Sequence, residues 1–311
     1  MNVTLRQIAR SDFEVHFEQS RDPEPVWLPS LRVTGQSPCI CYQQITLVPW
    51  GQDDREDRSP ASYRRPRRWT ATSYAPVVAR YVLLHSPLVG PTTWKWVAEE
   101  LRTEVDDVVV PTVAAATLSA GWRAVASEFA DQVPDTPGMV FVAHSGAGLL
   151  LPSIVDRARA VDASLVFVDA GIPSASVPTP LVPDEMLQEL TRIAENGVLP
   201  PWSDWFGPDV MKELIPDLEM RRLVTSDLPR LPLSYFSDAV LPVRPWPAAG
   251  NGYILLSEAY VDEASEAARR GWDVVELIGR HLDIVSKAHE VADAVRHLAV
   301  KVKDHKSNLL S

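Results

Sequence analysis

Ser145 stands in a setting that could turn its hydroxyl into a nucleophile. A short apolar run, 140–143, ends just before it, and small residues, Ala143 and Ala147, lie two positions on either side. Where a strand turns sharply into a helix, the apex residue takes a strained backbone conformation that bulky neighbours at those positions would obstruct. The hydroxyl would then stand exposed at the N-terminus of a helix, where backbone N–H groups stabilise a developing negative charge. This pattern makes Ser145 the candidate nucleophile.

Apolar runs alternate with helix-length segments from residue 80 onward, and they would position this serine. The expected strands cover 81–85, 107–110, 139–143, 164–169, 253–256 and 273–277. The expected helices cover 93–103, 118–132, 147–160, 262–270 and 288–302. Strands that are separated by helices form a parallel sheet with helices on its faces. The sequence therefore predicts an α/β fold with a mostly parallel, doubly wound sheet of about six strands.

The alternation of strands and helices stops between the fourth and fifth expected strands, in residues 173–248. This stretch is rich in proline and holds short amphipathic pieces at 184–195, 209–215 and 218–223. No alternation typical of strands is found in it. We expect a helical cap over about residues 173–248, inserted above the sheet.

Residues 1–77 differ from the rest of the chain, 78–311, because neither helical nor strand periodicity persists in them. They include a charged stretch at 52–58 and an Arg/Pro patch at 64–69. We expect a poorly ordered N-terminal extension, or an over-called start with translation beginning near Val77 or Val78. The basic patch could instead bind a partner electrostatically.

The composition is that of an ordinary globular protein. The chain has 311 residues, of which 46% are hydrophobic and 23% charged, so it can bury a large core. Its formal net charge is −11, and the main body lacks a basic cluster. Binding to nucleic acid needs a concentrated Lys/Arg surface, so a nucleic-acid partner is excluded. The expected partner is a small-molecule substrate, and the oligomeric state is not predicted.

Motifs for cofactors and membranes are missing from the sequence. It contains no Gly-rich phosphate loop, dinucleotide fingerprint or metal-ligand spacing, and the pair Cys39 and Cys41 is a weak metal signal that we interpret as incidental. We therefore expect no cofactor and no metal. Residues 1–19 lack the apolar core of a secretory signal, and no apolar run is long enough to span a bilayer. A cytoplasmic location without a membrane partner is expected.

The order of elements, with a serine elbow after the third strand and a histidine after the last, resembles the alpha/beta-hydrolase superfamily. The likeness covers about residues 79–303. The lack of strand patterns ahead of Tyr81 is similar to the compact members, the methylesterase and hydroxynitrile lyase group. The resemblance implies that His281, between the last strand and the last helix, is the base that activates Ser145.

The acid that orients this base is open to more than one assignment. Most members of the superfamily carry it a few residues after the strand at 253–256, where this chain has alanine or tyrosine, flanked by Glu258 and Asp262. The superfamily's other site is the end of the preceding strand, where Asp169 stands. We expect Asp169 to be the acid, with Glu258 as the alternative.

The oxyanion hole that the resemblance implies needs two donors. One is the backbone N–H of Gly146, directly after the serine. The second donor of similar proteins aligns with Pro87, which has no N–H to give. Leu88 could donate from a shifted loop, Ser86 could contribute its hydroxyl, or the site could lack a second donor. We expect Gly146 and Leu88.

These residues predict a serine hydrolase of the esterase kind, which acts on a carboxylic ester, thioester or lactone of an apolar small molecule. The substrate is expected in a cleft between cap and sheet. The expected substrate-binding residues are Ser86, Pro87, Trp202, Trp205, Phe206 and Tyr235. Two alternatives stay open: a lyase or cyclase on the same scaffold, suggested by Pro87, and a ligand-binding protein with a vestigial triad.

Overall fold

The computed structural model describes residues 31–33, 45–47, 80–102, 107–207, 209–248 and 250–309. The chain divides into two units, of which the first covers 1–36 and 42–77 and the second covers 37–41 and 78–311. In the first unit β1 (Leu31–Val33) pairs with β2 (Ile45–Leu47) in an antiparallel ladder. The rest of the N-terminal extension that we expect at 1–77 lies outside the described residues.

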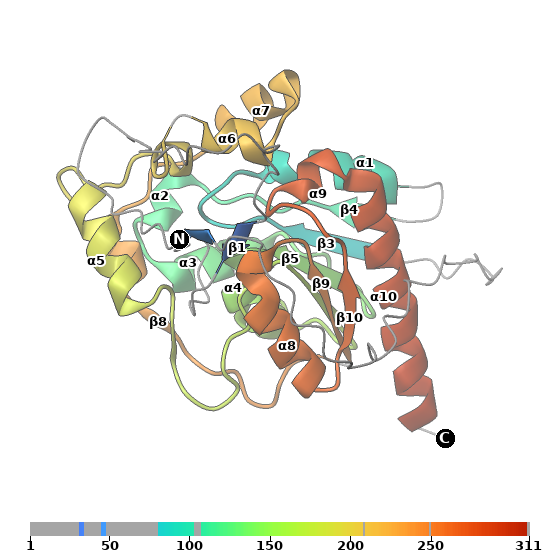
Figure 1. The fold of residues 1–311 in the computed structure, drawn as a ribbon. Helices are drawn as coiled ribbons and strands as arrows, with labels where there is room; N and C mark the ends of the chain where they lie inside the picture. The colour runs from blue at the N-terminus through green and yellow to red at the C-terminus, as the bar shows by residue number, and fades with distance from the viewer. Residues whose placement is uncertain are drawn as a thin grey trace, which may run out of the picture. The chain divides into compact units, whose positions relative to one another are not determined.

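The second unit is built on a six-stranded sheet in which every neighbouring pair is parallel (Figure 1). Its strands are β3 (Arg80–Leu84), β4 (Asp107–Val109), β5 (Val140–His144), β6 (Ser164–Val168), β9 (Gly250–Leu255) and β10 (Asp273–Glu276). Their order across the sheet is β10-β9-β6-β5-β3-β4. Every residue of β5 and β6 is buried, because helices cover both faces of a parallel sheet. The expected α/β fold is confirmed.

Helices cover the sheet on both faces (Figure 1). The 3-10 turn η1 (Pro91–Trp94) leads into α1 (Lys95–Leu101), which packs against α10 (Ala288–Leu309); α3 (Trp122–Asp131) packs against α4 (Ala147–Arg157). The helix α8 (Val261–Arg269) contacts β9 and β10. The short α9 (Asp283–Ser286) precedes α10.

One expected helix begins later than predicted. We predicted a helix over 118–132, but α3 begins at Trp122, after Gly121, and the short α2 (Ala115–Leu118) is a separate helix before it. Gly121 has φ 86°, a left-handed conformation that interrupts a helix and that glycine adopts without strain.

The elements of residues 173–248 are mainly short helices, as the amphipathic pieces indicated. Their elements are β7 (Thr179–Pro180), α5 (Asp184–Ile193), η2 (Trp202–Asp204), α6 (Val210–Leu214), α7 (Leu218–Thr225), η3 (Leu233–Ser237) and β8 (Ala239–Val240). The antiparallel pair of β7 and β8 was not predicted, because two residues a strand leave no alternation to detect. The division of the chain into extension, hydrolase domain and cap stays a prediction.

Candidate active site

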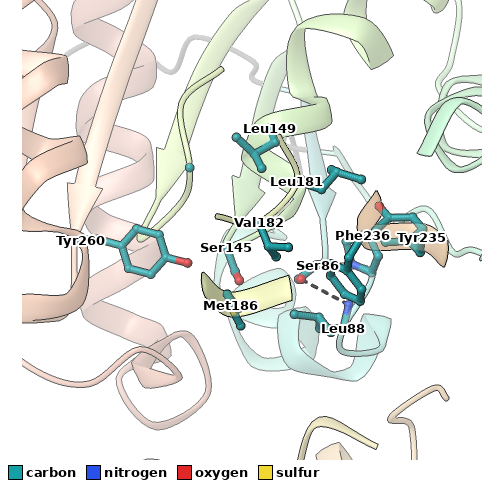
Figure 2. Close-up of a pocket in the computed structure, with 13 residues that line it drawn as sticks. Ser86, Leu88, Ser145, Leu149, Leu181, Val182, Met186, Tyr235, Phe236 and Tyr260 are labelled. Atoms are coloured by element: carbon teal, nitrogen blue, oxygen red, sulfur yellow. Dashed lines mark hydrogen bonds between the residues drawn. The ribbon is translucent and has the colours of Figure 1, made fainter. Parts of the chain in front are cut away.

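Ser145 follows β5 at the carboxyl edge of the sheet and precedes α4. Its backbone has φ 59°, which is rare for a residue with a side chain. The neighbouring strand holds it there, since the Ser145 N–H donates to the carbonyl oxygen of Val168 at 3.2 Å. Ala143 and Ala147 are fully buried on either side of it. The strained serine predicted from these small residues is therefore present, and its hydroxyl points into a pocket (Figure 2).

Asp169 follows β6, the next strand of the sheet, and its carboxylate is fully buried. Oδ1 accepts hydrogen bonds from the backbone N–H groups of Leu256 at 2.9 Å and Ser257 at 3.0 Å. Oδ2 accepts the Ser257 hydroxyl at 2.6 Å and the His281 Nδ1–H at 2.8 Å. Four donors thus compensate the buried negative charge, as burial of a carboxylate requires. The Nδ1–H bond leaves Nε2 of His281 as the ring atom able to accept a proton.

The alternative acids lie elsewhere. Glu258 begins η4 (Glu258–Tyr260) and is exposed, and Asp262 is exposed in the first turn of α8. Of these three carboxylates, Asp169 is the one whose hydrogen bond reaches His281. The residues after β9 still serve the site, because Ser257 donates to Asp169 through both its backbone and its hydroxyl.

The His281 ring is held from several sides. His144 donates from Nε2 to the His281 carbonyl oxygen at 2.9 Å, and the two ring centroids lie 4.5 Å apart. Tyr260 stacks on the His281 ring, with the two ring centroids 5.2 Å apart and an interplanar angle of 10°. Burial lowers the pKa of His144 well below its ordinary value, and the neighbouring His281 lowers it further. His144 is therefore a neutral support for the His281 loop.

The loop before α9 is braced by a buried carboxylate. Asp283 Oδ2 accepts the backbone N–H of Arg280 at 2.9 Å and pairs with the Lys287 ammonium at 3.1 Å. Gly279 permits this contact, because a Cβ there would lie 2.0 Å from Asp283 Oδ2. The backbone on either side of His281 is thus fixed.

His144 links Ser145 to His281: it directly precedes the serine in the chain, and its ring contacts the His281 imidazole. In the part of the chain that the structure describes, no hydrogen bond joins the Ser145 hydroxyl to the His281 ring. Hydrogen bonds of this kind are often long until substrate binds.

The loop after β3 brings Ser86 against the turn between β5 and α4, which holds Ser145 and Gly146. A Cβ on Gly146 would lie 3.1 Å from Ser86 Oγ, so the glycine gives the hydroxyl room beside Ser145. The Leu88 N–H donates to the same Ser86 Oγ at 3.3 Å, the dashed line in Figure 2. The Val89 N–H donates to the Ser86 carbonyl oxygen at 3.0 Å and closes the turn. Hence the Leu88 N–H is directed at Ser86 Oγ, and Pro87 has no backbone N–H to donate.

A pocket of about 500 Å³, its open mouth included, lies above Ser145 (Figure 2). Its lining joins residues of the sheet edge to residues of 173–248 and contains no charged side chain. The lining residues are Ser86, Pro87, Leu88, Ser145, Gly146, Leu149, Gly171, Leu181, Val182, Met186, Tyr235, Phe236 and Tyr260. Burial raises the pKa of the Tyr235 hydroxyl above its ordinary value, so this group is neutral.

The pocket contains some of the predicted binding residues and leaves out others. Ser86, Pro87 and Tyr235 line it, whereas Trp202, Trp205 and Phe206 are not among the lining residues. Those three aromatic side chains pack together, with Trp202 and Trp205 centroids 6.0 and 6.2 Å from that of Phe206. Trp202 also lies 6.4 Å from the His281 ring. Their role in binding stays a prediction.

Sequence reasoning missed most of the apolar lining. Leu181, Val182, Met186 and Phe236 come from residues 173–248, and Met186 is one of two buried residues on α5. The amphipathic pattern of α5 identified its buried face, but a pattern cannot say whether that face covers a pocket or a core.

Several solved structures share this fold, although no family model and no curated protein matches the chain. Tomato methylketone synthase I complexed with 2-tridecanone has a TM-score of 0.57 at 15% identity, over 73% of this chain and 99% of that chain. For polyneuridine aldehyde esterase the TM-score is 0.54 at 14% identity, over 72% of this chain and 100% of that chain. For an extracellular alpha/beta-hydrolase from a Paenibacillus species the TM-score is 0.51 at 17% identity, over 72% of this chain and 98% of that chain.

These likenesses and the topology of the sheet define the class: the chain has the alpha/beta-hydrolase fold. One neighbour is named extracellular, and the cytoplasmic location expected for this chain stays a prediction. None of the helices within the described residues is both long and apolar enough to cross a membrane. The same residues hold no group of three or more His, Cys, Asp or Glu side chains that could bind a metal ion.

Besides Asp169 and Asp283, the carboxyl group of Glu263 is buried. Glu263, on α8, is 6% exposed, and neither of its carboxyl oxygens has a hydrogen-bond partner. Burial, together with the charges of Asp262 and Asp169, raises its pKa to about 7. The folded state therefore holds Glu263 protonated at a pH where the unfolded chain ionises it.

This carboxyl group should make stability depend on pH. Between its ordinary pKa of 4.5 and about 7 the folded state binds more protons than the unfolded state, so stability falls as pH rises. Glu263→Gln should remove this dependence and gain about 2 kcal/mol relative to wild type between pH 5 and pH 7.5. Urea unfolding at both pH values measures it. The control is Glu258→Gln, an exposed carboxylate that is not among the charges acting on Glu263. An equal pH response in wild type and Glu263→Gln would contradict the prediction.

Proposed function

We propose that this protein is a serine hydrolase that cleaves a carboxylic ester, thioester or lactone of an apolar small molecule. The observation that carries the proposal is the 2.8 Å hydrogen bond between the buried carboxylate of Asp169 and Nδ1 of His281, at the sheet edge that also presents Ser145. A carboxylate, an imidazole and a strained serine in this order are the parts that nucleophilic acyl transfer needs.

The proposed reaction has two halves. His281 Nε2 takes the proton of the Ser145 hydroxyl as Oγ attacks the carbonyl carbon, and the protonated imidazole then gives that proton to the departing alcohol or thiol. Water attacks the acyl-enzyme in the second half, again giving its proton to Nε2, and the acid product leaves with Ser145 restored. Asp169 stays ionised throughout and stabilises the imidazolium that forms in each half.

Two donors would stabilise the oxyanion: the Gly146 backbone N–H and the Ser86 hydroxyl. The Leu88 N–H occupies a lone pair of Ser86 Oγ, which leaves the hydroxyl proton free to point at the reacting oxygen. In this mechanism Leu88, which we expected to donate directly, acts by orienting Ser86. A side-chain hydroxyl thereby replaces the N–H that Pro87 lacks.

The apolar lining supports a neutral substrate, because a charged group would lose its hydration in the pocket without gaining an ion pair. Two neighbours of the same fold bear on this choice. One is complexed with 2-tridecanone, an apolar ketone. Another, from Sphingobium faniae, is named a pyrethroid hydrolase, and it has a TM-score of 0.56 at 15% identity, over 72% of this chain and 98% of that chain.

Hydrolysis of p-nitrophenyl butyrate by the full-length protein tests the proposal. We expect steady release of p-nitrophenol, and Ser145→Ala should lower kcat at least about 10³-fold, because the nucleophile is lost. Folding of the variant is checked by circular dichroism. A folded wild-type protein that releases nothing from a series of acyl chain lengths would favour the lyase, cyclase or ligand-binding alternatives.

The assignment of the acid has a matched test. Asp169→Asn should lower kcat about 10²- to 10⁴-fold, because the amide can hold the wrong imidazole tautomer and cannot compensate the imidazolium charge. Glu258→Gln removes the rival carboxylate and should keep kcat within about twofold, since Glu258 is exposed and makes no hydrogen bond to His281. The reverse ranking of the two variants would exchange their roles.

The role of Ser86 is tested by removing and by retaining its hydroxyl. Ser86→Ala should lower kcat about 10²-fold with little change in KM, because the donor acts on charge that develops in the transition state. Ser86→Thr keeps a hydroxyl at the same atom and should recover most of kcat. Equal kcat in wild type and Ser86→Ala would show that this hydroxyl is not a donor.

A further inference from the structure

Tyr260 is fixed against the proposed base and reaches the pocket. Its side chain is 1% exposed, yet it belongs to the pocket lining together with Ser145. Its ring is parallel to the His281 imidazole at a centroid distance of 5.2 Å. In Figure 2 its hydroxyl points toward the pocket interior, on the side of Ser145 opposite Ser86 and Leu88.

The segment 256–260 ties this tyrosine to the catalytic pair. Its first residues donate to Asp169, and its last residue stacks on His281. Tyr260 also closes η4 by donating its N–H to the Ser257 carbonyl oxygen at 3.2 Å. The phenol hydroxyl is therefore held at a set position relative to the base, and such a group can donate or accept a hydrogen bond.

We infer that the Tyr260 hydroxyl binds an oxygen atom in the leaving group of the substrate and so selects esters of oxygen-bearing alcohols. The inference rests on the proposed function. In acyl transfer the carbonyl oxygen turns toward its donors, Gly146 and Ser86, and the leaving group turns toward the base that protonates it. Tyr260 stacks on that base and lies on the side of Ser145 opposite Ser86 (Figure 2), so its hydroxyl faces the leaving group.

The chemistry of the lining makes this contact selective. Most of the lining side chains are apolar, and an ether, hydroxyl or carbonyl oxygen buried among them loses its bonds to water. A hydrogen bond from the Tyr260 hydroxyl would replace one of the lost bonds to water, whereas an alkyl chain without oxygen needs no hydrogen bond. The preferred substrates are thus esters whose alcohol carries a second oxygen a few bonds from the ester oxygen.

Two substrates of equal length test the inference. 2-Methoxyethyl butyrate and n-butyl butyrate differ by one ether oxygen in place of a methylene group, and the ratio of their kcat/KM values reports the contact. Tyr260→Phe keeps the stacked ring and removes the hydroxyl. We expect this variant to lower the ratio about three- to tenfold relative to wild type, the value of one hydrogen bond. Intrinsic differences in ester reactivity cancel in the comparison.

Tyr235→Phe is the matched control, because Tyr235 is the other tyrosine of the lining. It should leave the ratio unchanged. An equal ratio in wild type and Tyr260→Phe, or an equal fall in the two variants, would overturn the assignment to Tyr260 while leaving hydrolysis established. If wild type cleaves neither ester nor p-nitrophenyl butyrate, the proposed function itself fails.

Discussion

The buried carboxylate of Asp169 is the constraint on which the site depends. An ionised carboxyl group without partners in a protein interior costs several kcal/mol, so its donors must be brought to it. They come from two other segments: Leu256 and Ser257 follow β9, and His281 follows β10. The ends of three strands are therefore tied together at one point. This is also the point at which the His281 ring is held, through its Nδ1 atom.

The main sheet could be predicted from the sequence because a parallel strand that is buried on both faces produces an unbroken apolar run. β5 and β6 are such runs, and both were found within one residue of their expected bounds. Features without a period of their own were missed. The division of α2 from α3 depends on a single backbone angle at Gly121, and the pair of β7 and β8 is too short for alternation.

The site was predictable to the extent that local rules govern it. The small neighbours of Ser145 indicated a strained turn from five residues of sequence alone. Contacts over long separations gave no such signal: Asp169 and His281 are 112 positions apart in the sequence, and their pairing came from a family resemblance. The double contact of Ser257 with Asp169 and the stacking of Tyr260 on His281 were not foreseen, because each depends on how β9 meets its neighbours.

The loop after β3 shows how a local loss can be offset by its surroundings. Pro87 removes a backbone donor, and a serine hydroxyl is a poorer substitute than an N–H because it rotates about its C–O bond. Preorganised donors stabilise a transition state best, since they need no reorientation during the reaction. The Leu88 N–H restricts this rotation, and the absence of a side chain on Gly146 leaves room for the oxygen. In the proposed mechanism, residues 86–88 and Gly146 therefore form one unit, in which a change at any position alters the donor that Ser86 presents.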